Sequence, residues 1–82
     1  MLYAAQIRAA RALLGWRQEE LASAAKVGLS TIQKIEQTGG LVMGNVSTVI
    51  RLQQALEKAG IKFLDTDSHG GPGVRWKDAP RV

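Results

Sequence analysis

The residues that could carry catalytic or metal chemistry are few. The sequence has one histidine and no cysteine, so thiolate zinc sites and cysteine nucleophiles are excluded. His69 has only Asp65 and Asp67 as nearby partners, and a polar turn explains these three residues better than a metal or catalytic site. The serines at 23, 30, 47 and 68 have no base in register. We therefore expect no enzyme activity, metal or cofactor.

Basic charge points to a different chemistry. The chain has 82 residues, with 11 basic and seven acidic side chains and a net charge of +4. Such a balance favours polyanionic partners through long-range attraction and counterion release. No apolar run approaches the roughly 18 residues of a membrane span, and the N-terminus does not resemble a signal peptide. We expect one small, soluble, cytoplasmic protein with no membrane partner.

The most informative stretch runs from Gln18 to Glu36 and reads QEELASAAKVGLSTIQKIE. It predicts one short helix opening at Arg17 and ending near Ala25, and a second over residues 29–37. Lys26-Val27-Gly28 reads as a tight turn between them. Ala22 provides the small side chain that two steeply crossing helices require, while Leu21, Ile32 and Ile35 are predicted to be buried.

Two longer helices are predicted around this pair. An amphipathic stripe indicates a helix over residues 2–14, ended by Gly15. Asn45 is a natural N-cap for a fourth helix that ends at Gly60. Residues 61–64 and 73–77 look like short strands joined by a turn-rich segment, which predicts a β-hairpin. The apolar stripes are Tyr3, Ile7, Ala10 and Leu14 in the first helix, and Val49, Leu52, Leu56 and Ala59 in the fourth, supported by Val46 and Ala55.

From Ile7 to Gly60 this order and spacing resembles the helix-turn-helix of the phage repressor and Cro-like family, often called the XRE family. The resemblance implies a mainly α fold: a four-helix repressor-like domain, here followed by a short C-terminal β-hairpin or strand. It also implies sequence-specific binding of double-stranded DNA by a repressor-like transcriptional regulator. Arg11 and Glu36 have the separation at which related repressors pair an arginine with a glutamate.

The resemblance also assigns DNA contacts to particular positions. For Leu29 there is an alternative to a base contact, in which its side chain packs against the turn. The predicted base contacts are Leu29, Ser30, Gln33 and Lys34, and the predicted phosphate contacts are Arg17, Gln18, Lys26 and Thr31.

The turn and the following loop depart from the family pattern. Lys26 stands where the family usually has a left-handed glycine, which costs about 1–2 kcal/mol if that conformation is kept. Alternatively, Gly28 shifts the turn. Gly28 also replaces the usual polar N-cap, and the loop after the second short helix is poor in lysine and arginine.

Domain organisation and assembly complete the expectations. We expect residues 1–60 to form the DNA-binding domain and residues 61–82 a C-terminal segment that provides the contact of a two-fold homodimer. The alternative is that the hairpin folds back on the first and fourth helices of its own chain. Two other functions fit the sequence: an antitoxin that also binds a protein toxin, and an interaction module that has lost DNA binding.

Overall fold

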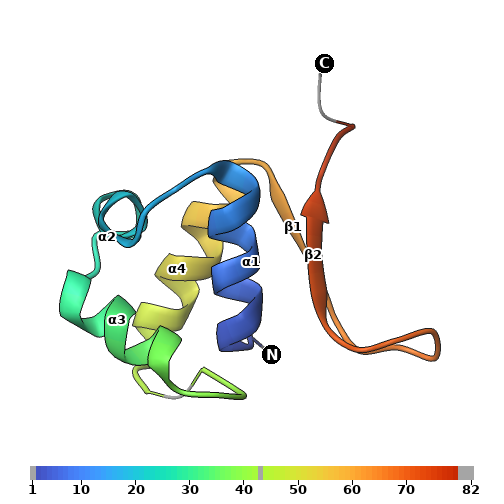
Figure 1. Cartoon of the computed structure of the whole chain (residues 1–82), viewed down its shortest axis with the longest axis horizontal. Coiled ribbons are helices and arrows are strands. Elements are labelled where there is room, and N and C mark those ends of the chain that lie inside the picture. Colours follow the sequence, from blue (N-terminus) through green and yellow to red (C-terminus); the bar gives the residue numbers. More distant parts are fainter. Residues whose placement is uncertain (1, 43, 80–82) are drawn as a thin grey trace.

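The computed structural model describes residues 2–42 and 44–79, which form four helices followed by a two-stranded antiparallel sheet. In Figure 1, α2 and α3 lie on one side of α1, and the hairpin lies on the other. The mainly α fold with a C-terminal hairpin is thereby confirmed. The elements are α1 (Ala4–Leu14), α2 (Gln18–Ala25), α3 (Leu29–Gln37), α4 (Val46–Lys58), β1 (Ile61–Leu64) and β2 (Gly73–Trp76).

The core draws a large aliphatic side chain from each helix and from β1. Its largest fully buried side chains are those of Ile7, Leu21, Ile32, Leu52, Leu56 and Ile61. Ile35, predicted to be buried beside Ile32, is only half-buried. The predicted support from Val46 is wrong, since this residue is 71% exposed. The first turn of α4 stands beside an open groove, whereas its later turns pack between α2 and β1.

The N-terminus is tied to the loop that follows α3. We predicted a helix from residue 2, but α1 begins at Ala4, because Tyr3 is extended and bridges to Leu41. The Val42 N–H donates to the Leu2 carbonyl at 2.7 Å. Likewise α2 begins at Gln18 rather than at Arg17, which is extended and precedes the helix.

The predicted helix boundaries at Gly15 and Asn45 are confirmed. Gly15 adopts the left-handed conformation that ends α1, with φ of 69°. The Asn45 side chain accepts a hydrogen bond from the Ser47 N–H at 2.8 Å, which caps the start of α4.

The hairpin folds back onto α1 and α4 within one chain. Ile61 pairs with Trp76 and packs inward, whereas Lys62 pairs with Arg75 on the exposed outer face. Gln6 fastens the two strands to α1, because its Nε2 donates to the carbonyls of Leu64 (3.2 Å) and Gly73 (3.0 Å). The core of the helices therefore continues directly into the hairpin.

Candidate nucleic-acid interface

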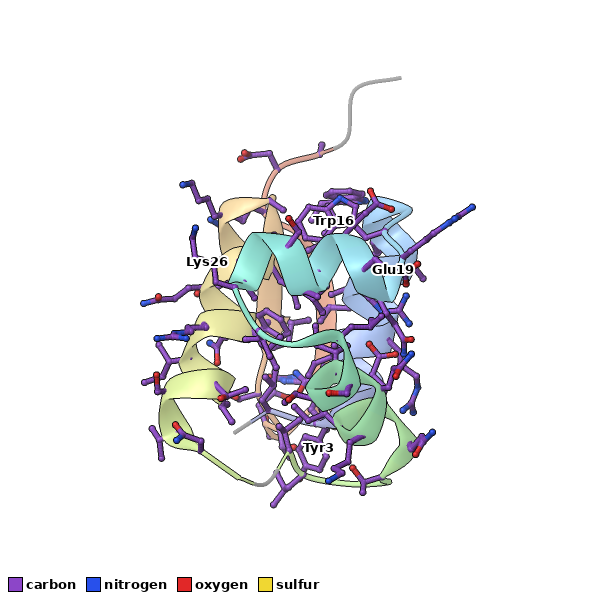
Figure 2. All side chains as sticks on the ribbon, turned by 90° about the vertical axis from the view of Figure 1, so that its left-hand side faces the viewer. Tyr3, Trp16, Glu19 and Lys26 are labelled. Atoms are coloured by element: carbon purple, nitrogen blue, oxygen red, sulfur yellow. The ribbon has the colours of Figure 1, made fainter. Side chains whose placement is uncertain are left out.

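The turn between α2 and α3 keeps the left-handed conformation at Lys26, with φ of 56° and ψ of 47°. Gly28 is extended, with φ of −61°, so it does not shift the turn. The sequence left two alternatives open, a left-handed Lys26 or a turn shifted by Gly28, and the structure has the left-handed Lys26. Figure 2 shows Lys26 at one end of α2 and Glu19 near the other, so the exposed lysine lies where the turn toward α3 begins.

One side of α3 is anchored and the other is open. Ile32 is fully buried and Glu36 is 8% exposed. Ser30, Gln33 and Lys34, three of the four residues predicted to contact bases, are exposed on this helix. Leu29 is half-buried, so it combines partial packing with partial access. The helix is thus held from behind while its first two turns present polar side chains to solvent.

The four residues predicted to contact phosphates lie at or next to the ends of the two short helices. Arg17, Lys26 and Thr31 are exposed. Gln18 is half-buried, and its Nε2 donates to Glu36 Oε1 at 3.2 Å. Arg17 and Lys26 flank α2, so the pair brackets this helix with positive charge.

Glu36 joins α1, α2 and α3 at a single residue. Arg11 donates to its two carboxylate oxygens through Nε at 2.7 Å and Nη2 at 2.6 Å, which confirms the predicted pair. Arg8 Nη1 donates to the Glu36 carbonyl at 2.8 Å. Arg8 lies three residues before Arg11 and so shares its face of α1, a signal that the sequence contained. The hydrogen bond from Gln18 to Glu36 depends on how α2 crosses α3, and the sequence carries no signal for it.

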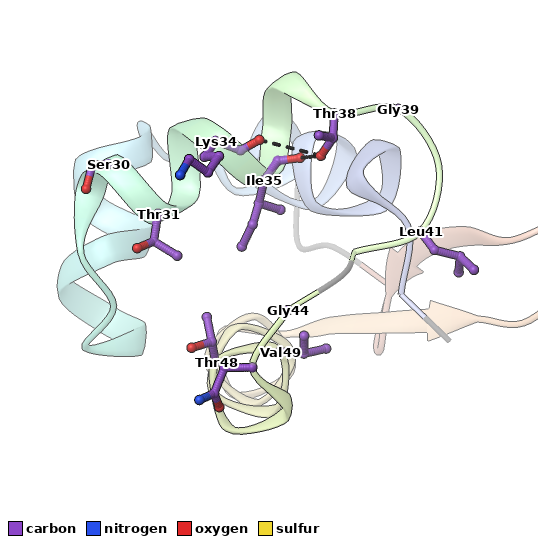
Figure 3. A pocket seen from close by; sticks show the side chains of 11 residues that line it. Ser30, Thr31, Lys34, Ile35, Thr38, Gly39, Leu41, Gly44, Thr48 and Val49 are labelled. Carbon is purple, nitrogen blue, oxygen red and sulfur yellow. Dashed lines mark hydrogen bonds between the residues drawn. The ribbon is translucent and has the colours of Figure 1, made fainter.

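A groove of about 640 Å³ separates α3 from the start of α4. In Figure 3, Ser30, Thr31 and Lys34 lie on the α3 side, and Thr48 and Val49 on the α4 side. Of the described residues that line it, none is acidic. A channel with hydroxyl donors and one lysine suits a polyanion. Thr48 was not among the predicted site residues, because the sequence does not show that α4 begins opposite α3.

The cluster around His69 forms the turn at the tip of the hairpin. Asp67 Oδ1 accepts hydrogen bonds from the N–H groups of His69 (2.8 Å) and Gly70 (3.1 Å). Within residues 2–42 and 44–79, no group of three or more histidine or acidic side chains could hold a metal ion. Nor is any helix in these ranges long and apolar enough to cross a membrane.

Comparison with known proteins gives one match. A family model described as helix-turn-helix matches residues 7–38, which run from α1 through α2 and the turn to the end of α3. Neither the curated proteins nor the solved structures gave a match. The matched segment coincides with the helices that Glu36 joins and with the exposed face of α3. Residues 7–38 therefore form a helix-turn-helix similar to that of the phage repressor and Cro-like family, a family of DNA-binding domains.

Proposed function

We propose that this protein binds double-stranded DNA sequence-specifically and regulates transcription in the manner of a repressor. One observation supports this most strongly: α3 exposes Ser30, Gln33 and Lys34 while its opposite side is fixed to the core. A helix of this kind can enter the major groove with its first turns against base edges.

The exposed side chains supply suitable base chemistry. Lys34 can donate to guanine O6 or N7, and Gln33 can make paired hydrogen bonds to adenine. Ser30 tolerates several bases, and the accessible part of Leu29 can contact a thymine methyl group. We infer that these four residues carry the sequence preference.

The surrounding donors suit the phosphate backbone. We assign to phosphates the four residues at or next to the ends of the two short helices, Arg17, Gln18, Lys26 and Thr31. The groove beside α3 adds the Thr48 hydroxyl. These contacts would orient the domain and contribute affinity that falls as salt is raised.

We further propose that two copies bind as a two-fold homodimer. One recognition helix covers only a few base pairs, and the loop after α3 adds no lysine or arginine. Pairing two copies would place two recognition helices roughly 34 Å apart on a near-palindromic site.

Selection of bound sequences from random duplex DNA tests both proposals. We expect the wild-type chain to enrich two inverted half-sites whose centres lie about 10–10.5 base pairs apart. Lys34→Ala should relax the preference at one position of each half-site, since a base contact provides about 1–3 kcal/mol of discrimination. Lys58→Ala is the matched control, because it removes an exposed lysine from the last turn of α4 and should leave the motif unchanged.

Each alternative outcome has a definite meaning. A single half-site contradicts the dimer, and a motif unaltered by Lys34→Ala contradicts the proposed orientation of α3. An antitoxin would also enrich a motif, so its toxin would have to be sought separately. An interaction module that has lost DNA binding would enrich no sequence, which would overturn the proposed function.

A further inference from the structure

Gln18 is held by the carboxylate of Glu36, 18 positions further along the chain. Gln18 opens α2, and Glu36 lies in the last turn of α3. We propose that Glu36 is a positioning residue for DNA binding, which fixes the Gln18 carboxamide so that one of its N–H groups faces a DNA phosphate. This inference rests on the proposed DNA-binding function and adds a residue that itself makes no DNA contact.

The chemistry of a carboxamide explains why it needs to be oriented. Its nitrogen carries two N–H donors and its oxygen is an acceptor. A freely rotating Gln18 would often present its oxygen to the phosphate, which repels it. The Glu36 carboxylate accepts only from the nitrogen, and hydrogen bonds to an ionised acceptor are stronger than neutral ones. One N–H is thus bound to Glu36, and the second remains to donate to a phosphate oxygen.

Arg11 makes this carboxylate compatible with DNA. An unpaired carboxylate beside a phosphate site would repel the backbone, but Arg11 binds both of its oxygens through two donors. The carboxyl side is the more enclosed of the two, with 5% of the Glu36 side chain exposed against 19% for Arg11. Glu36 therefore acts as an oriented acceptor whose charge is compensated from α1.

A double-mutant cycle on DNA affinity tests the proposal. Glu36→Gln and Gln18→Ala should each weaken binding to the selected duplex by about two- to ten-fold, the range for one net hydrogen bond. If Glu36 acts through Gln18, the double variant binds no more weakly than Gln18→Ala alone. In the control cycle, Glu36→Gln combined with Lys34→Ala should give the product of the two single effects.

If the losses of affinity caused by the two single substitutions multiply in the Gln18 cycle as they do in the Lys34 cycle, the proposal is wrong. Since Glu36→Gln could also unfold the domain, a second measurement uses the unmodified chain. The side-chain amide of Gln18 should show an NMR order parameter close to that of the backbone, whereas that of exposed Gln54 should be low. Equal mobility of the two amides overturns the positioning role. Failure of the wild-type chain to bind any duplex overturns the proposed function instead, and leaves the amide measurement interpretable.

Discussion

Lys26 is the residue at which this helix-turn-helix departs most clearly from the family that it resembles. Among the residues that the structure describes, it is the only non-glycine with a positive φ. An L-amino acid with a side chain pays about 1–2 kcal/mol for this conformation, which glycine adopts at no steric cost. The lysine brings a cation to the turn after α2 that glycine cannot supply.

Lys26→Gly should therefore change stability and DNA binding in opposite directions. We expect the free energy of unfolding to rise by about 0.5–1 kcal/mol, because relief of strain exceeds the added entropy of the unfolded chain. The slope of the logarithm of DNA affinity against the logarithm of salt concentration should become shallower by about one unit. Urea unfolding and fluorescence anisotropy at several salt concentrations measure the two effects.

Ala9→Gly is the control for this substitution, since exposed Ala9 lies in a right-handed turn of α1. It should lower the free energy of unfolding by about 0.5–1 kcal/mol. If Lys26→Gly destabilises the chain to a similar extent, the strain argument is wrong.

The sequence anticipated single residues only where local chemistry decides them. The stop at Gly15 and the cap at Asn45 depend on neighbouring backbone groups, and both were predicted. Arg11 and Glu36 were paired only through the family resemblance. The contact of Arg8 with Glu36 could have been inferred from its spacing to Arg11. The contact of Gln18 with Glu36 depends on where the helices meet, which no local pattern specifies.

At the scale of elements, Gln6 joins the hairpin to the helical domain. The residue is 3% exposed, and its side chain makes three hydrogen bonds, two to the hairpin carbonyls and one from the Tyr3 N–H. In the sequence, nothing about Gln6 on the apolar side of the first helix indicated that it would bind the hairpin. The helices were predictable from their stripes and caps, whereas the docking of the hairpin depends on long-range contacts, which include the Gln6 hydrogen bonds and the burial of Ile61.

Gln6→Ala should loosen the hairpin more than the helices. Carbonyls that lose their donor cost up to about 1–3 kcal/mol when buried, and those of Leu64 and Gly73 are partly buried. We expect hydrogen exchange at the amides of residues 61–64 and 73–76 to accelerate by about ten-fold or more. Gln54→Ala, on the exposed side of α4, is the control. Indistinguishable exchange in the two variants would show that Gln6 does not hold the hairpin.

At the scale of the whole molecule, α1 separates two surfaces. The helix-turn-helix lies on one side and the hairpin on the other (Figure 1). The outer face of the hairpin carries Lys62 opposite Arg75, so basic charge is not confined to the proposed DNA interface. Net charge alone therefore cannot say which surface meets DNA. Ile61 belongs to the core of the helices, so the hairpin cannot be removed at Gly60 without opening that core.

The most direct test of the central claim is an NMR cross-saturation experiment on the intact chain bound to its selected duplex. Irradiation of the DNA protons attenuates only those protein amides that lie close to DNA, which distinguishes DNA contact from dimer contact. We predict attenuation at residues 17–18 and 26–34, and none at Lys62 or Arg75. Attenuation centred on the hairpin, or an absence of attenuation along α3, would contradict the assignment of α3 as the recognition helix.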